Sequence, residues 1–234
     1  MTDLLNSAEL DALRKIDTPT VCNALEYLDE RFRTHGFTTQ PFVSLDATLE
    51  PLVGYAMTAT IRAHEKPLLS PEKLRERRLE YYEYIASGPR PGIIVIQDLD
   101  PNPGFGAFWG EVNTTVHQAL GVNGALTNGS FRDTDACAKG FQILGGLIGP
   151  SHAYVHVVDT AISVHVHGLA VQPGALIHAD HHGAVAMSSE LARQVPEVAA
   201  LLGRREKVIL DACKAPGFSI DSLKAAIQGS ADIH

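Results

Sequence analysis

Three side chains, two acidic and one basic, carry the clearest chemistry in this sequence. Glu111 opens a predicted helix after a loop rich in glycine and proline, and Arg132 and Asp133 follow a second predicted strand. An arginine can hold a carboxylate through two charge-assisted hydrogen bonds, and carboxylate oxygens ligate Mg²⁺ directly or through water. Free N–H groups at a helix start also attract anions. These residues predict binding of a small acid beside a divalent metal.

A strand, helix, strand unit is predicted to position them. Residues 92–98 (GIIVIQD) form a continuous apolar run, typical of a strand buried on both faces. Residues 111–120 are predicted to be a helix and residues 124–127 a second buried strand, with the right-handed parallel crossover as the expected connection. Ligands collect beyond the carboxyl ends of such strands. The residues expected to face inward from the helix are Val112, Val116, Ala119 and Leu120.

The flanking segments complete an α/β pattern. Residues 7–28 have helical spacing with a break at Thr18-Pro19, and residues 54–62 alternate as a strand does. A charged helix is expected from Ser70 to Gly88, with Leu74, Leu79, Tyr82 and Ile85 on its apolar face. Short alternating strands after residue 152 favour antiparallel pairing. Helices are predicted over 188–213, interrupted near Pro196, and over 219–227.

Composition excludes several classes of protein. A net charge of −8 argues against nucleic-acid binding, because phosphates select basic surfaces. No apolar run reaches the length of a membrane span. The three cysteines are widely spaced and odd in number, which suits buried structural thiols in a reducing compartment. We therefore expect a cytoplasmic protein folded as a single domain over residues 1–234.

Other interpretations of the same residues stay open. Glycine-rich turns and Arg-Asp pairs are common at solvated helix starts without any function. The pair His165 and His167, on one face of a strand, and the segment 178–182 could hold zinc, as in a metallohydrolase. The glycines at 104, 106 and 110 approach a dinucleotide fingerprint, but their spacing is wrong by one residue.

The sequence resembles the RraA-like family, which includes class II 4-hydroxy-4-methyl-2-oxoglutarate aldolases. The signature is an acidic residue, Glu111 here, separated by residues 112–131 from the pair Arg132-Asp133. Similar text also occurs at residues 17–25 (DTPTVCNAL), 107–115 (AFWGEVNTT), 121–133 (GVNGALTNGSFRD) and 168–183 (GLAVQPGALIHADHHG). One departure is Asn128-Gly129, where Asp-Gly is commoner in the family.

The resemblance implies a role for each matching position. Arg132 would bind the 2-oxo acid and stabilise its enolate, Asp133 would ligate the metal, and Glu111 would hold a metal-bound water. Backbone amides from Gly110 through Val112 to Asn113 would bind the pyruvyl carboxylate. The implied metal is Mg²⁺, with Mn²⁺ as the alternative.

The resemblance also implies a fold and a reaction. The fold would be an RraA-like swivelling α/β sandwich with a central mixed sheet, a βαβ unit, antiparallel C-terminal strands and helical extensions at both ends. The chain would form homotrimers or hexamers with sites at subunit interfaces, and would cleave a 2-oxo acid to a pyruvate enolate, with oxaloacetate decarboxylation as a side activity. The alternative is a non-catalytic regulatory binding protein. We also hypothesise that residues 64–88 shape substrate specificity.

Overall fold

The computed structural model describes residues 4–233. Its helices are α1 (Ser7–Arg14), α2 (Thr18–Leu28), α3 (Pro71–Ser87), α4 (Glu111–Ala119), α5 (Ser189–Lys214) and α6 (Ile220–Ala231), with a short 3-10 turn, η1 (Glu30–Arg33). Capping explains their starts, since Asp17, Ser70 and Ser188 each accept a backbone N–H in the first turn of the helix that follows. None of the described helices is both long and apolar enough to cross a membrane.

A mixed sheet forms the centre of the molecule. Its strands are β1 (Val43–Ser44), β2 (Leu52–Arg62), β3 (Gly92–Asp98), β5 (Val122–Thr127), β7 (Gln142–Gly145), β9 (His156–Thr160), β12 (Leu176–Asp180) and β13 (Gly183–Met187). The order is β1-β7-β5-β3-β2-β12-β13, with β9 also pairing with β2. Strands β2, β3, β5 and β7 are mutually parallel, and the other pairs are antiparallel. The predicted fold class is confirmed.

Strand β2 has three partners. It lies parallel to β3, while on its other edge its first half pairs with β12 and its second half with β9. The register with β9 shifts between Thr60 and Ile61, and such irregularities bend a strand and increase its twist. The sheet therefore curls around its own centre.

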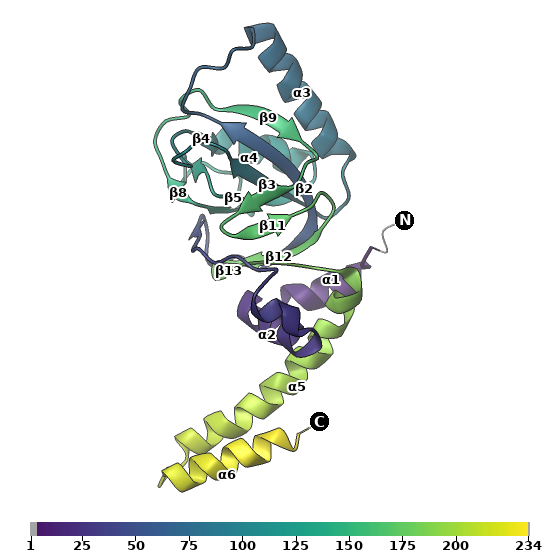
Figure 1. The fold of residues 1–234 in the computed structure, drawn as a ribbon, viewed down its shortest axis with the longest axis vertical. Helices are drawn as coiled ribbons and strands as arrows, with labels where there is room; N and C mark the ends of the chain where they lie inside the picture. The colour runs from purple at the N-terminus through teal and green to yellow at the C-terminus, as the bar shows by residue number, and fades with distance from the viewer. Residues whose placement is uncertain (1–3, 234) are drawn as a thin grey trace.

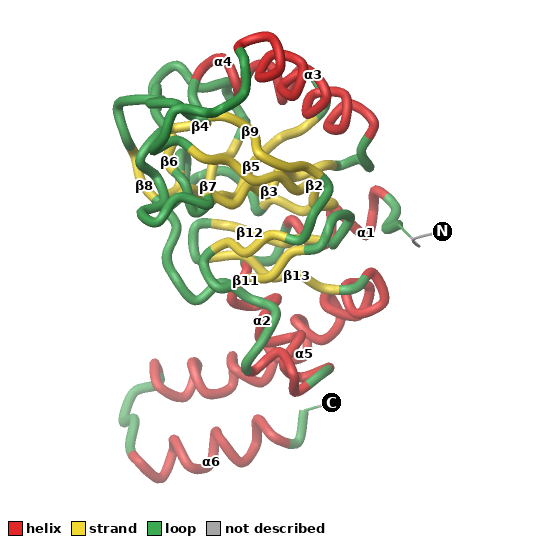
Figure 2. The backbone as a smooth tube through the Cα atoms, turned by 45° about the horizontal axis from the view of Figure 1, so that its top comes forward, coloured by secondary structure: helices red, strands yellow, loops and turns green. Residues whose placement is uncertain are grey.

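Side chains from the two faces of β3 enter different cores. Ile94 and Ile96 pack with Tyr81 of α3 in one cluster, whereas Ile93 and Val95 pack on the opposite face. There they meet the hairpin of β10 (Val164–Val166) and β11 (Leu169–Val171). The prediction of a strand buried on both faces is confirmed. Figures 1 and 2 show α3 and α4 on one side of the sheets, and α1, α2 and α5 beneath β12 and β13.

A second, smaller sheet of three parallel strands is not predicted from the sequence. It joins β4 (Ala107–Trp109), β6 (Ser130–Phe131) and β8 (Leu147–Ile148) in that order. The loop rich in glycine and proline that precedes Glu111 is predicted over residues 99–110, and this is wrong at residues 107–109, because very short strands owe their conformation to partners that lie far along the chain.

The inward faces of α3 and α4 also differ from expectation. Leu79 is 56% exposed and Val112 is 72% exposed. Tyr81 is buried in place of Leu79, and Thr114 and His117 are buried in place of Val112 and Ala119. Polar residues can take these positions because each finds a hydrogen-bond partner. Thr114 donates to the Gly110 carbonyl at 2.9 Å, and the Tyr81 hydroxyl contacts His117 Nε2 at 2.7 Å.

Two further expectations are wrong at the C-terminal end. Helix α5 is continuous through Pro196. A proline removes a single helical hydrogen bond, and contacts of α5 with both α2 and α6 support the helix. The two last helices form a hairpin that projects from the sheets (Figure 1). Cys213 lies on this hairpin and is exposed. Burial raises the pKa of Cys22 to about 11, so that thiol stays protonated, as a structural cysteine does.

Candidate active site

The small sheet brings the predicted residues together. Trp109 of β4 pairs in register with Phe131 of β6, so the residues that follow each strand emerge side by side. The Arg132 N–H donates to the Trp109 carbonyl at 3.0 Å, which extends this pairing by one step. The start of α4 and the pair Arg132-Asp133 therefore lie at the carboxyl ends of neighbouring parallel strands, where ligands collect.

The Asp133 carboxylate occupies the N-terminus of α4. The Glu111 N–H points at Asp133 Oδ2 across 3.4 Å, and Gly110, the N-cap residue, makes no side-chain cap. A β-carbon built on Gly110 would lie 2.6 Å from Asp133 Oδ2. Gly110 has extended backbone, with φ of −178°, so this position requires the absence of a side chain and not an unusual conformation.

Asp133 itself has a strained backbone. Its φ is 54°, in the left-handed region that non-glycine residues enter infrequently. Aspartate tolerates this region better than most residues, and strained residues cluster at ligand-binding sites. The conformation turns the chain sharply after β6 and directs the carboxylate back toward Gly110.

The Arg132 guanidinium is only loosely held. Its Nε lies 3.4 Å from Asp133 Oδ2, and Nη1 donates to the Pro150 carbonyl at 3.4 Å. Both contacts are long for charge-assisted bonds. The side chains of Arg132 and Asp133 are 36% and 37% exposed. The Arg132 guanidinium therefore retains N–H groups that can donate to an incoming carboxylate.

These groups line a pocket of about 280 Å³. Its walls include Gly110, Val112, Asn113, Arg132 and Asp133. All five are residues that the sequence predicts for the site. The side chain of Glu111 is exposed and does not line the pocket. The structure thus gathers the expected residues, with Glu111 at the rim.

Glu111 nevertheless lies near the Asp133 carboxylate. Burial raises the pKa of the Cys137 thiol, a hydrogen bond with Thr114 lowers it, and the negative charges of Asp133 and Glu111 raise it further. Both charges can raise the pKa of the Cys137 thiol only if both carboxylates lie close to it. The Asp133 and Glu111 carboxylates therefore both lie near the Cys137 thiol.

Asn113 is positioned by residues that the sequence analysis did not assign to the site. The Tyr82 hydroxyl donates to Asn113 Oδ1 at 3.0 Å, and Asn113 Nδ2 donates to the Phe108 carbonyl at 2.5 Å. His117 Nδ1 lies 2.6 Å from the Asn113 carbonyl. Tyr82 comes from α3, so that helix supports the predicted carboxylate cradle. The spacing of aromatic residues on α3 indicates packing only, and no sequence signal singles out Tyr82.

The donor set fits a hard divalent cation. Asp133 offers carboxylate oxygens beside a space that any side chain at position 110 would fill, and Glu111 adds a second carboxylate nearby. Mg²⁺ is typically held by one or two protein carboxylates, with water and substrate completing its shell. A 2-oxo acid between Arg132 and Asp133 would supply such substrate oxygens.

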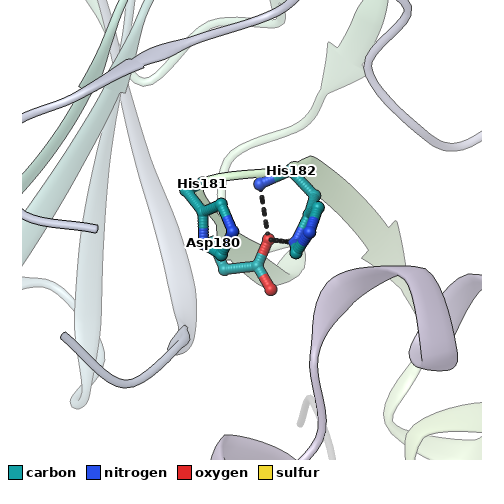
Figure 3. A group of neighbouring side chains, drawn as sticks. All are labelled: Asp180, His181 and His182. Atoms are coloured by element: carbon teal, nitrogen blue, oxygen red, sulfur yellow. Dashed lines mark hydrogen bonds and ion pairs between the residues drawn. The ribbon is translucent and has the colours of Figure 1, made fainter. Parts of the chain in front are cut away.

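The histidine-rich segments have a different character. Asp180, His181 and His182 are the one set of three metal-ligating side chains, among residues 4–233, whose ligand atoms all lie within 4.8 Å of one another (Figure 3). The Thr18 N–H and the His182 N–H each donate to Asp180 at 2.8 Å. Burial acts to raise the pKa of Asp180, and these N–H groups outweigh it and leave the pKa lowered. Asp180 thus has a structural role at the start of α2.

His165, His167 and His178 do not form a site together. His178 is buried, and its ring nitrogens contact the Thr18 hydroxyl at 3.1 Å and the Ile16 carbonyl at 3.0 Å. His165 is exposed on β10, whereas His167 lies beyond the strand in a turn with φ of 49°. The expectation that His165 and His167 share one face is wrong, because β10 ends at Val166.

The chain is similar to known proteins in both sequence and fold. A family model described as RraA-like, Aldolase/RraA, matches residues 18–186. No curated protein matches the sequence. The fold is similar to that of an uncharacterized protein from Pseudomonas syringae pv. tomato str. DC3000, with a TM-score of 0.72 and 20% identity over 98% of this chain and 97% of that one. It is also similar to Streptomyces coelicolor RraAS2, described as an unusual member of the RNase ES inhibitor RraA protein family, with a TM-score of 0.68 and 19% identity over 88% and 98% of the two chains.

Proposed function

This chain belongs to the RraA-like family, and from that membership and the geometry of the candidate active site we propose that it is a divalent-metal-dependent lyase acting on a 2-oxo acid. The observation that carries the proposal is the convergence, in one pocket, of a loosely held guanidinium, the amides of a helix N-terminus and a carboxylate in strained backbone. Each suits a different part of a 2-oxo acid bound to a cation.

The substrate carboxylate would lie at the start of α4. The N–H groups of the first turn, from Gly110 to Asn113, face an anion with the positive end of the helix dipole. The Arg132 fork would bind the same fragment from the other side. Tyr82 and Phe108 hold Asn113 and so fix this turn before substrate arrives.

Asp133, with Glu111 acting through water, would hold Mg²⁺ or Mn²⁺, which supplies Lewis-acid polarisation of the 2-oxo group. For 4-hydroxy-4-methyl-2-oxoglutarate the C3–C4 bond breaks and its electron pair stays on C3 as an enolate. The 4-hydroxyl loses its proton and becomes the ketone of one pyruvate, and a proton returned to C3 completes the other. Arg132 offsets the negative charge that grows on the enolate oxygen.

Oxaloacetate decarboxylation follows from the same site. Loss of CO₂ from C4 leaves the same pyruvate enolate, so Arg132 would stabilise the same charge. The main difference between the two reactions lies in the group that departs and in the part of the pocket that holds it.

The assembly stays a prediction. A homotrimer or a dimer of trimers is implied by the resemblance, and light scattering of the purified protein measures it directly. A monomer with full activity would contradict the expectation that the site lies at a subunit interface.

A second candidate function is regulatory binding without catalysis. It is favoured by the similarity of fold to the Streptomyces coelicolor protein, whose description names an RNase inhibitor family. Such a role needs an exposed surface and has no use for a metal-binding carboxylate. Metal dependence therefore separates the two candidates.

The deciding experiment is pyruvate release from 4-hydroxy-4-methyl-2-oxoglutarate and from oxaloacetate, with Mg²⁺ or with a chelator. We expect metal-dependent release that falls about 100-fold or more in Arg132→Ala. Arg132→Lys keeps the charge but not the two-pronged geometry, so it should recover only part of the rate. Release from neither substrate would contradict the lyase proposal.

A further inference from the structure

The candidate active site continues into a larger groove. This groove, of about 540 Å³, lies between α3 and residues 152–157. The residues that line both the pocket and the groove are Arg78, Phe108, Val112, Asn113, His152 and Val155. A ligand longer than pyruvate could therefore extend from Arg132 along an apolar floor without leaving the site.

The groove is lined by positive charge. Arg75, Arg77 and Arg78 all line it, together with two histidines, and no aspartate or glutamate does. Helix α3 separates its charges by face, because residues three, four or seven apart share a side. The acids on α3 are Glu72, Glu76, Glu80 and Glu83, and none of them lines the groove.

Two of these arginines have no hydrogen-bond or ion-pair partner among residues 4–233. Arg77 Nη1 donates to the Val158 carbonyl at 2.8 Å and ties α3 to β9. Within the described residues, neither Arg75 nor Arg78 makes a hydrogen bond or an ion pair. Their guanidinium groups are free to bind an anion in the groove.

Arg78 is also close to the reacting end of the pocket. Burial raises the pKa of Tyr82, and the positive charge of Arg78 acts in the opposite direction, which places the two side chains near each other. Tyr82 in turn donates to Asn113. Arg78 and Asn113 also both line the smaller pocket, so Arg78 lies beside the predicted carboxylate cradle at the start of α4.

We propose that Arg78, assisted by Arg75, is the specificity-determining residue of this site, because it binds the distal carboxylate of a 2-oxo dicarboxylic acid and so distinguishes that substrate from a 2-oxo acid with an uncharged end. The inference rests on the proposed function. The 2-oxo acid end lies at Arg132 and α4, the carbon chain crosses Phe108 and Val155, and the distal carboxylate meets the guanidinium of Arg78. A planar fork suits a carboxylate better than a single amine would.

The test compares two substrates that both release pyruvate by the same bond cleavage. In 4-hydroxy-4-methyl-2-oxoglutarate the distal end is a carboxylate, and in 4-hydroxy-2-oxopentanoate it is a methyl group. We expect Arg78→Gln to raise KM for the first about tenfold, as loss of one charge-assisted bond at a partly open site would. The kcat for 4-hydroxy-4-methyl-2-oxoglutarate should change less than about twofold, and so should kcat and KM for 4-hydroxy-2-oxopentanoate. Arg78→Lys should restore part of the loss.

Lys73→Gln is the matched control, since it removes one positive charge from the same helix at a position that does not line the groove. If Arg78→Gln and Lys73→Gln have the same effect, or if Arg78→Gln impairs both substrates equally, the proposal is wrong. The second result would indicate that Arg78 acts through the structure of α3.

A binding measurement tests the role of Arg78 independently of the lyase proposal. Calorimetric titration with 2-oxoglutarate and with pyruvate, in the presence of Mg²⁺, requires no turnover. If neither hydroxy acid is cleaved but Arg78→Gln weakens 2-oxoglutarate alone, the lyase proposal fails and the dicarboxylate site stands. If cleavage occurs and Arg78→Gln changes neither substrate nor either titration, the dicarboxylate site fails and the lyase proposal stands.

Discussion

Replacing Gly110 with alanine would test the site through a single added carbon atom. The new β-carbon would lie 2.6 Å from Asp133 Oδ2, whereas ordinary contacts begin at 3.4 Å. The carboxylate must therefore retreat by about 0.8 Å, the difference between these two distances. The extended backbone at position 110 accepts alanine without strain, so the fold should survive, with a large shift of Asp133 and a slight one of Arg132, whose Cγ would lie 3.3 Å from the new atom.

A misplacement near 1 Å in a reacting site costs about 100-fold in rate. We expect kcat/KM of Gly110→Ala to fall about 100-fold in the pyruvate-release assay. The concentration of Mg²⁺ that gives half-maximal activity should rise as well. Thermal unfolding should stay within a few degrees of the parent protein.

Gly203→Ala is the control for glycine replacement in general. Gly203 lies within α5 with nothing near its missing β-carbon, so alanine should stabilise the helix by about 0.5–1 kcal/mol and leave activity unchanged. If Gly110→Ala is folded and keeps the parent kcat/KM and metal requirement, Asp133 does not act at the position described above.

Three further predictions concern metal binding, acid stability and the hydrogen bonds between Asn128 and the end of β3. Metal analysis should show that Asp133→Ala loses bound Mn²⁺ and that His181→Ala retains it. The reverse result would favour the histidine-rich segment as the metal site. Burial lowers the pKa of His117 from its usual 6.5 to about 4, so the unfolded chain takes up a proton first as the pH falls. The stability linked to this group is complete above pH 6.5 and declines by about 3 kcal/mol as the pH falls toward 4; urea unfolding across this range should show the decline, and His117→Gln should flatten it. Asn128 accepts from the Asp98 N–H at 2.7 Å and donates to its carbonyl at 3.0 Å, and an aspartate cannot make the second bond. Asn128→Asp should therefore cost about 1–3 kcal/mol at pH 7, and a variant as stable as the parent would show that this bridge contributes little.

Sequence reasoning succeeds where a pattern is local. The apolar run of β3, the Ser70 cap with Pro71 at the start of α3, and the break before Pro19 depend on neighbouring residues only, and the structure agrees with all three. The proximity of Arg132 to the start of α4 also follows from the parallel order of two strands.

The rest depends on partners distant in the sequence. Strand β4 exists because residues 107–109 pair with β6, and no pattern of three residues can show this. The buried position of His117 depends on the hydroxyl of Tyr81, which lies on another helix. The groove beside α3 needs residues 152–157, which follow that helix in the sequence only after the strands β3 to β8.

The three partners of β2 bear on how the protein is made. During synthesis this strand leaves the ribosome well before β9 and β12, which lie at residues 156–160 and 176–180. At typical elongation rates of 5–20 residues per second, the edge of β2 that β9 and β12 cover waits on the order of 5–20 s for its partners. That edge belongs to an almost entirely buried, apolar strand, the kind that aggregates when unpaired. A nascent chain arrested before residue 180 should therefore be far more prone to aggregation than the finished protein.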